Sequence, residues 1–424
     1  MSFFDSRWVG APGHVRELAA DAGLPGGFRA AGVACGIKPS GRPDLGLLVC
    51  DAERPSSAVR LTTSLAPAAP VQIVRERCAV DALRGVLANS GCANAATGER
   101  GLEDAAQTQQ AAATALGVQS EQVALASTGG ISHHLPVERV LVGLAEASAR
   151  LSAAGDLDFQ RAIETTDSLE KRANLEVELA AGTVRLAAQC KGAGMISPRF
   201  ATMLCFLETD AALSPGVADA LLGPAVASSF DRISVDGQLS TNDTVVLLAS
   251  GEAGVTVGPD GEDARLLGEA LEALLRGLAV KIVADGEGAR RIARVRVNGG
   301  VGDEAERAAR AVANSPLVKA ALNGGDPNWG RILQAVGGEL AGATSVGGAQ
   351  LGADRLAPVG IAIEGIEVCA GGAALEVDEG ALAAAVAGKE VEYEISLPGN
   401  GASAEVFFSD LSHDYVTLNA EYTT

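Results

Sequence analysis

The hydrophobic positions along the chain fall into short apolar runs and longer amphipathic stretches. We expect runs of strand length to be strands, and stretches with apolar residues every three or four positions to be helices. The predicted strands are 28–38, 45–50, 122–126, 201–208, 244–249, 291–298, 359–363, 390–396 and 404–408. The predicted helices are 103–116, 137–152, 217–230, 263–282, 303–314 and 378–388, with a hairpin over 172–189. This mixture predicts an α/β protein with helices and sheets in layers.

A turn-forming segment, Asp285-Gly286-Glu287-Gly288, separates two parts of this pattern. We therefore predict a main domain over residues 1–285 and a smaller α/β domain over 286–424. The length of 424 residues is consistent with two or three structural units.

Composition narrows the class of protein. The chain has 33 Lys and Arg against 53 Asp and Glu, a formal net charge of −20. Such an acidic chain offers little basic surface to nucleic acid, so we expect no nucleic-acid partner. No stretch of about 18 apolar residues and no signal-like N-terminus are present, so we expect a cytoplasmic protein with no membrane partner. Seven scattered cysteines without a CxxC pair, and only four histidines, favour neither disulfides nor a metal site.

The segment 191–204 carries the candidate chemistry, because it places the pair Ala201-Thr202 after two glycines and Pro198. A threonine hydroxyl can attack the preceding carbonyl through a five-membered ring, and hydrolysis of the ester cuts the chain between Ala201 and Thr202. Thr202 then has an α-amino group with a pKa of about 7.7–8.0, suited to act as general base beside its own hydroxyl. The spacing alone also fits an ordinary β-branched strand residue.

Lys191-Gly192-Ala193-Gly194-Met195 followed by Ala201-Thr202-Met203 resembles the self-cleavage region of the ornithine acetyltransferase (glutamate N-acetyltransferase) family. Other blocks are similar to that family, in the same order, over nearly the whole chain. They are Gly27–Val33, Gly36–Lys38, Asn89–Ala95, Thr97-Gly98, Ala126–Gly129, Thr165–Asp167, Ser234–Asp236, Ser240–Thr244, Asp285–Ala289, Asp326–Arg331 and Asn419–Thr424.

The resemblance implies a helix–sheet–sheet–helix sandwich like that of self-processing N-terminal-nucleophile aminopeptidases, with a C-terminal tail that returns to the active site. It implies cleavage into chains 1–201 and 202–424, which assemble as a heterotetramer. Thr202 is the implied nucleophile, and Thr128 and Gly129 are the implied oxyanion hole. Without the family, Ser127–Gly130 would be interpreted as a polar turn after a strand.

The same resemblance implies a set of substrate contacts: Thr165, Lys191, Thr202, Glu287, Asn419 and Thr424. Lys191 suits an α-carboxylate, and Glu287 suits the δ-ammonium group of ornithine. By themselves these residues also fit a solvated surface lysine and an exposed acid in a turn that ends a helix. Asn419 and Thr424 lie where most chains fray, so a functional role predicts a docked tail.

Other matched residues are expected to be structural. Asn242 and Asp243 suit the fastening of a turn, and we do not assign them a catalytic role. Trp329 is expected to anchor domain packing. His133 and His134 lack a third metal ligand at helical spacing. Lys171 stands in Ser168-Leu169-Glu170-Lys171, where the family usually has Pro-Lys.

The expected activity is transfer of the acetyl group from N-acetyl-L-ornithine to L-glutamate through an acetyl-Thr202 intermediate, in the cyclic pathway of arginine biosynthesis. No metal and no cofactor are expected, because the amide itself carries the acetyl group. The sequence leaves open whether acetyl-CoA is a second donor. The alternatives are a self-processing amide hydrolase or aminopeptidase with water as acceptor, and a binding protein without catalysis.

Overall fold

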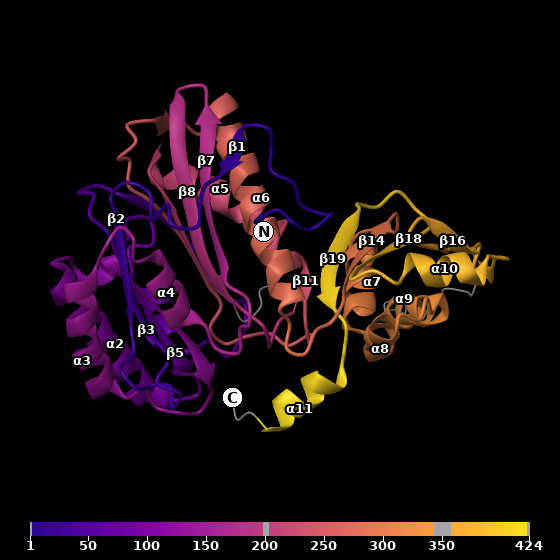
Figure 1. The fold of residues 1–424 in the computed structure, drawn as a ribbon, viewed down its shortest axis with the longest axis horizontal. Helices are drawn as coiled ribbons and strands as arrows, with labels where there is room; N and C mark the ends of the chain where they lie inside the picture. The colour runs from indigo at the N-terminus through magenta and orange to yellow at the C-terminus, as the bar shows by residue number, and fades with distance from the viewer. Residues whose placement is uncertain (1, 198–202, 343–357, 422–424) are drawn as a thin grey trace. The chain divides into compact units, whose positions relative to one another are not determined.

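The computed structural model describes residues 2–197, 203–342 and 358–421, which form two compact units (Figure 1). The first unit contains the chain up to Asp231 and Leu239–Ile282, and the second contains Arg232–Gln238 and the chain from Val283. The predicted main domain included 232–238. The structure places this segment in the second unit because β11 (Ile233–Ser234) pairs in parallel with β19 (Ala404–Ser409). Within the described ranges, no helix is both long and apolar enough to cross a membrane.

Two sheets form the centre of the first unit. The four-stranded sheet has the order β2-β3-β5-β6, and the six-stranded sheet has the order β1-β7-β8-β9-β12-β4. Most of these strands are buried along nearly their whole length, as expected for strands that are covered on both faces. The strands of the smaller sheet are Phe28–Val33 (β2), Leu45–Cys50 (β3), Gly85–Cys92 (β5) and Val123–Gly130 (β6). Those of the larger sheet are Val15–Glu17 (β1), Lys171–Leu179 (β7), Gly182–Lys191 (β8), Leu204–Thr209 (β9), Thr244–Ala249 (β12) and Ser56–Leu61 (β4).

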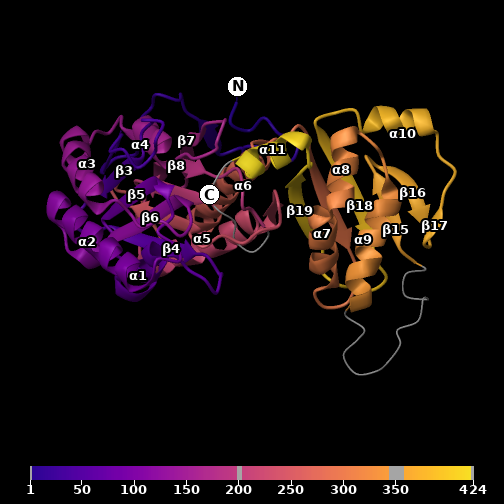
Figure 2. The same ribbon diagram turned by 90° about the horizontal axis from the view of Figure 1, so that it is seen from below.

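Helices cover the outer faces of both sheets, which gives a helix–sheet–sheet–helix sandwich and confirms the predicted class (Figures 1 and 2). On the smaller sheet lie Ala69–Arg77 (α1), Gly98–Leu116 (α2) and Val137–Arg150 (α3). On the larger sheet lies Pro215–Ala227 (α5), which packs on Glu262–Ala284 (α6) where Leu221 meets Gly268. The unit also contains β10 (Ala212–Leu213), β13 (Thr256–Val257) and the 3-10 turn Ser120–Gln122, and a second 3-10 turn, Phe230–Arg232, leads from it into the second unit.

A short helix, α4 (Asp156–Ile163), contacts strands of both sheets. Its Phe159 is fully buried and packs edge-on against Phe206 of β9, with ring centroids 5.2 Å apart. The ring also lies 2.8 Å from the place where a Cβ would stand at Gly46 of β3, so only glycine fits there. With aromatics at only 3% of the chain, most of the remaining core consists of Ala, Val, Leu and Ile. Phe159 therefore joins the two sheets.

The second unit has a seven-stranded sheet of order β11-β19-β14-β18-β15-β16-β17. Its further strands are Ile292–Asn298 (β14), Gly360–Ile363 (β15), Ile366–Ala370 (β16), Ala373–Ala374 (β17) and Glu390–Ser396 (β18). Its helices are Glu304–Asn314 (α7), Pro316–Gly324 (α8), Trp329–Gly342 (α9), Glu379–Ala385 (α10) and His413–Glu421 (α11). Trp329 packs against this unit's own core, whereas Arg294 and Glu392 form an ion pair on the polar positions of β14 and β18. Apolar and charged residues alternate along β14 and β18, so one face of the sheet packs against the helices and the other carries charged side chains.

Candidate active site

The predicted oxyanion segment is the end of a strand. Ser127–Gly130 continues β6, so the interpretation as a polar turn is wrong. Cys92 of the parallel neighbour β5 lies opposite both Thr128 and Gly130, which marks a bulge. Gly129 has φ +127°, and a Cβ there would lie 2.4 Å from the backbone of Gly91. Only glycine can occupy this position, and the bulge gives its backbone an orientation that a regular strand would not.

Lys191 ends β8 and is buried beside this bulge. Its side chain is 2% exposed, so the interpretation as a solvated surface lysine is wrong. The Nζ atom donates a hydrogen bond to Oγ1 of Thr128, itself 2% exposed, over 3.3 Å. Two predicted site residues that are 63 positions apart in sequence therefore meet. A buried cation and a hydroxyl at one point can stabilise negative charge that develops on an oxygen atom.

Asp167 connects Thr165 to the end of β8. Its Oδ1 accepts hydrogen bonds from Lys171 Nζ and from the amide N–H of Gly192, each over 2.8 Å. Its Oδ2 accepts the N–H of Thr165 over 2.9 Å. The carboxylate thereby holds the backbone of Thr165 close to that of Gly192, the residue after Lys191. Thr165 and Lys191 are both predicted substrate contacts.

Charges around Asp167 favour its ionised form. Burial opposes ionisation, but the charges of Lys171 and Lys191 and the hydrogen bonds outweigh it and hold the pKa of Asp167 below its usual value. For the buried Lys38 the neutral form is favoured, because burial first and the charge of Arg42 second lower its pKa to about 8. Arg42 also donates to the backbone carbonyl of Thr165 over 3.1 Å.

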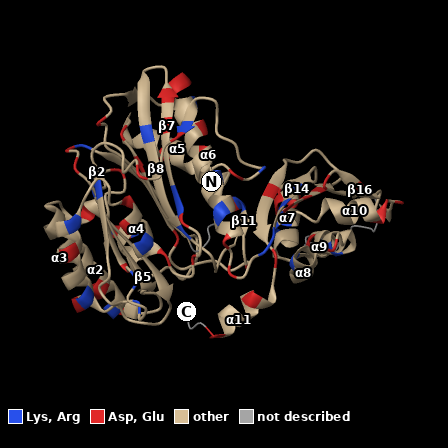
Figure 3. Ribbon diagram, in the orientation of Figure 1, with Lys and Arg blue, Asp and Glu red and all other residues tan. Residues whose placement is uncertain are grey.

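This positive environment is local. Acidic and basic residues are interspersed along the ribbon of both units (Figure 3), and the chain as a whole has a net charge of −20. Four cations, Lys38, Arg42, Lys171 and Lys191, occur together around Thr165 and the end of β8, with the acids Asp44, Glu164 and Asp167 among them. Such a cluster suits the carboxylate of an amino-acid substrate.

The residues that follow the predicted cleavage point begin beside Lys191. Ala201 and Thr202 lie outside the described residues, and Met203 is the first one after them. Leu204, the first residue of β9, lies directly opposite Lys191 in the antiparallel ladder with β8. Met203 donates its N–H to Oδ1 of the buried Asp243 over 3.1 Å. Burial raises the pKa of Asp243 well above its usual value, against the opposing effects of the Met203 N–H and the Lys191 charge.

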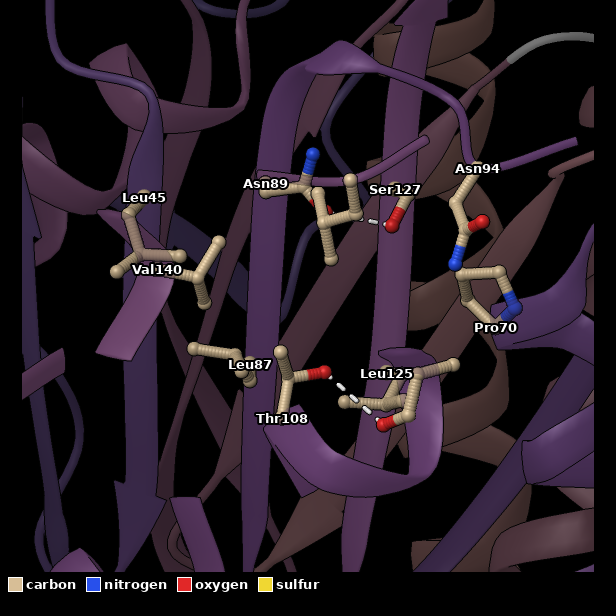
Figure 4. A pocket seen from close by; sticks show the side chains of 11 residues that line it. Leu45, Pro70, Leu87, Asn89, Asn94, Thr108, Leu125, Ser127 and Val140 are labelled. Carbon is tan, nitrogen blue, oxygen red and sulfur yellow. Dashed lines mark hydrogen bonds between the residues drawn. The ribbon is translucent and has the colours of Figure 1, made fainter. Parts of the chain in front are cut away.

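A small cavity lies on the face of the four-stranded sheet that its helices α2 and α3 cover (Figure 4). Its volume of about 10 Å³ is enough for roughly one water molecule, and no predicted catalytic residue lines it. Ser127 donates to Oδ1 of Asn89 over 2.6 Å, and Asn89 donates to the carbonyl of Cys92 over 2.9 Å (Figure 4 shows the first of these bonds). These two hydrogen bonds link the cavity lining to Cys92, which lies in the bulge.

Two further predicted contacts, Glu287 and Asn419, belong to the second unit. Asn419, exposed on α11, donates its amide to Oε2 of Glu287 over 2.8 Å. Burial first, and the nearby acids Asp236 and Glu287 second, raise the pKa of Tyr415 to about 12. A cationic group suits this environment. Thr424 lies outside the described residues.

Two connections in the site were missed by the sequence interpretation. Asp167 and Asp243 stand in matched blocks, but Asp167 was given no role and Asp243 was expected to fasten a turn. Their partners Gly192 and Met203 lie 25 and 40 residues away, and no local pattern announces such contacts. The one signal in the sequence is that each aspartate stands in a short block that is otherwise rich in serine and threonine.

All seven cysteines are free thiols, five of them buried, as expected for small apolar side chains. In the parts of the chain that the structure covers, no three His, Cys, Asp or Glu side chains are placed to share a metal ion.

The fold is a layered sandwich in which the ends of β6 and β8 bring a buried lysine and a threonine hydroxyl into contact. Comparison with known proteins gives the family: the profile of the ArgJ family matches residues 29–424. The chain belongs to the ArgJ family, which confirms the predicted resemblance.

Individual relatives agree. The arginine biosynthesis bifunctional protein ArgJ of Symbiobacterium thermophilum is 41% identical over 411 residues, which is 96% of this chain and 99% of that protein. The protein of the same name from Nitratidesulfovibrio vulgaris is 41% identical over 401 residues, 94% of this chain and 98% of that one. A solved structure of ornithine acetyltransferase from Mycobacterium tuberculosis, complexed with ornithine, is 36% identical over 45% of this chain and 99% of that chain, with a TM-score of 0.40.

Proposed function

We propose that this chain is a self-processing acetyltransferase that transfers the acetyl group of N-acetyl-L-ornithine to L-glutamate in arginine biosynthesis. The contact between Lys191 and Thr128 carries the proposal, because it unites a candidate carboxylate-binding cation and a candidate oxyanion donor in a member of the ArgJ family. The names of the relatives, arginine biosynthesis bifunctional proteins, support the pathway.

The first step is cleavage of the chain by its own threonine. The hydroxyl oxygen of Thr202 attacks the carbonyl carbon of Ala201, the peptide C–N bond breaks, and the hydroxyl proton passes to the nitrogen of Thr202. Water then hydrolyses the ester, which leaves a carboxylate on Ala201 and restores the hydroxyl of Thr202. The products are the chains 1–201 and 202–424, which we propose remain associated and pair into a heterotetramer in the cytoplasm.

The second step loads the acetyl group onto Thr202. Its hydroxyl oxygen attacks the acetyl carbonyl while its own α-amine accepts the proton. The hydroxyl of Thr128 and the N–H of Gly129 donate to the oxyanion, and each such donor lowers the barrier by about 3–4 kcal/mol. The amide C–N bond then breaks, the proton passes to the departing amine, and ornithine leaves.

The third step returns the acetyl group. The neutral α-amine of glutamate attacks the acetyl-Thr202 ester and gives up a proton through the Thr202 amine to the hydroxyl oxygen. N-Acetylglutamate leaves and the enzyme is restored. No metal or cofactor takes part, because the donor amide carries the acetyl group. The word bifunctional in the names of the relatives supports acetyl-CoA as a second donor.

Substrate recognition follows from charge. Lys191 is proposed to bind the α-carboxylate common to both amino acids, with Thr165 beside it. Glu287 and Asn419 are proposed to recognise the δ-ammonium group that distinguishes ornithine, and Thr424 completes the set.

The test uses the purified full-length chain. Mass spectrometry under denaturing conditions should find the two fragments 1–201 and 202–424, and incubation with acetyl-labelled N-acetylornithine and glutamate should yield N-acetylglutamate and ornithine in equal amounts. Acetate release that glutamate does not affect would indicate the hydrolase instead. An intact chain without transfer would indicate a binding protein.

A further inference from the structure

The loop Ser240–Thr244 joins parts of the first unit that are distant in sequence. The hydroxyl of Thr62 donates to the carbonyl of Ser240 over 2.7 Å, and the N–H of Thr62 donates to the carbonyl of Asp243 over 3.0 Å. The amide of Asn242 donates to the carbonyl of Ala93 over 2.8 Å. The hydroxyl of Thr62, backbone groups and the amide of Asn242 therefore fasten this loop through bonds that do not use the carboxyl of Asp243.

The carboxyl of Asp243 instead contacts Met203. The ladder between β9 and β12 pairs Leu204 with Thr244, and the N–H of Thr244 donates to the carbonyl of Met203 over 3.2 Å. Oδ1 of Asp243 accepts the N–H of Met203. The side chain thereby extends the strand pairing by one residue toward the predicted cleavage point, so both backbone polar groups of Met203 are held.

The second oxygen of this carboxyl is unusual. Asp243 is fully buried, and Oδ2 has no hydrogen-bond partner among the residues that the structure describes. Burial raises the pKa of this carboxyl, the side chains of Ser240 and Thr62 act on it in the opposite direction, and the N–H of Met203 is the backbone group that it holds.

We propose that Asp243 is a positioning residue for self-cleavage, which acts by holding the N–H of Met203 and so the backbone immediately after the Ala201–Thr202 bond. This inference rests on the proposed function. Intramolecular attack depends on the alignment of the reacting atoms, and a displacement of about 1 Å can slow a reaction roughly 100-fold.

The test compares cleavage rates of full-length chains labelled during cell-free synthesis and followed on denaturing gels. Asp243→Ala removes the acceptor and should be cut roughly 10- to 100-fold more slowly than the wild type. Asp243→Asn keeps an oxygen that can accept from Met203 and should restore cleavage nearly to the wild-type rate. The matched control is Glu208 on β9, a fully buried carboxyl that also has one unpartnered oxygen but holds no backbone near the cleavage point. Glu208→Ala should be cut at the wild-type rate.

Cleavage of Asp243→Ala at the wild-type rate overturns the inference, as does equal slowing by Glu208→Ala or by Asp243→Asn. If Asp243→Ala does not fold, the cleavage rate of Asp243→Glu tests the inference instead. This variant keeps the carboxyl group but places its oxygen atoms one methylene group further from the backbone. Slow cleavage of that variant supports positioning, and normal cleavage contradicts it. A wild-type chain that is never cut overturns the proposed function as well, whereas a cut wild type with insensitive Asp243 variants overturns this inference alone.

Discussion

Two predicted site residues of the first unit, Thr128 and Lys191, are buried and bonded to each other, whereas Glu287 and Asn419 of the second unit are half-buried and exposed. Thr128 and Lys191 lie at the ends of β6 and β8, and the buried Asp167 holds neighbouring backbone. Glu287 is half-buried and bonds to the exposed Asn419.

The difference indicates a division of tasks. Interactions between charges are stronger where water is excluded, and fixed donors need no reorganisation during a reaction. Exposed charges are screened by salt but still distinguish a cation from an anion. We infer that the buried group serves the acyl chemistry and the exposed pair serves selection of ornithine. Four substitutions test this division, from the largest expected effect to the smallest.

Thr202→Ala should abolish both cleavage and acetyl transfer, with activity reduced at least roughly 10⁴-fold, because a double displacement has no substitute for its nucleophile. Mass spectrometry of the chain and an assay of N-acetylglutamate measure the two losses. Thr209→Ala, which removes a buried threonine hydroxyl from β9, is the matched control and should be cut normally. Normal processing of Thr202→Ala would exclude this residue as the nucleophile.

Asp167→Asn should lower the free energy of unfolding by about 3–5 kcal/mol, because it leaves Lys171 buried without its ion-pair partner. Urea unfolding measures the loss. Asp51→Asn breaks the exposed pair with Arg29 and should cost at most about 1 kcal/mol. An equal loss in the free energy of unfolding for both substitutions would contradict the difference that we infer between buried and exposed ion pairs.

The effect of Asp167 also depends on pH. Its pKa in the folded state lies below its ordinary value of 3.8, so its contribution to stability is present above that value and is lost as the pH falls toward the folded pKa. The difference in stability between the wild type and Asp167→Asn should therefore shrink below about pH 4 and stay constant between pH 5 and 7. A difference that grows on acidification would contradict the assignment.

Thr128→Ala should lower kcat about 10²- to 10³-fold with little change in KM, because the hydroxyl acts on charge that appears only in the transition state. Thr128→Ser keeps the hydroxyl and should recover most of the activity. Steady-state kinetics with N-acetylornithine as donor measure both variants. A rise in KM at constant kcat would instead make Thr128 a substrate contact.

Glu287→Gln should raise the KM for N-acetylornithine by roughly fivefold to tenfold and leave the KM for glutamate unchanged, because an exposed charge pair contributes about 1 kcal/mol. The effect should decrease as salt is added. Asp303→Asn, which removes an exposed carboxylate from the same unit, controls for net charge and should leave both values unchanged. An effect on both substrates would exclude selection by charge.

Much of the fold could be predicted from local pattern. The strands Leu45–Cys50 and Thr244–Ala249 have the predicted bounds, because continuous apolar runs of strand length are recognisable without their neighbours. The predicted strand 28–38 ends at Val33, since Asp44 accepts the N–H groups of Cys35 and Lys38 and bends the chain. Helix α4 was not predicted, because a helix of eight residues depends on packing such as that of Phe159.

The sequence by itself determined to which family the chain belongs and named the candidate residues for its chemistry, because short blocks of glycine, hydroxyl, lysine and acid residues are recognisable without the fold. Only the tertiary structure decided that Lys191 is buried against Thr128, that Asp167 links the backbone of Thr165 to that of Gly192, and that Asp243 holds Met203. The physical reason is that burial and hydrogen bonding depend on strands that pair across tens of residues, and the local sequence does not specify which distant group will meet a given side chain.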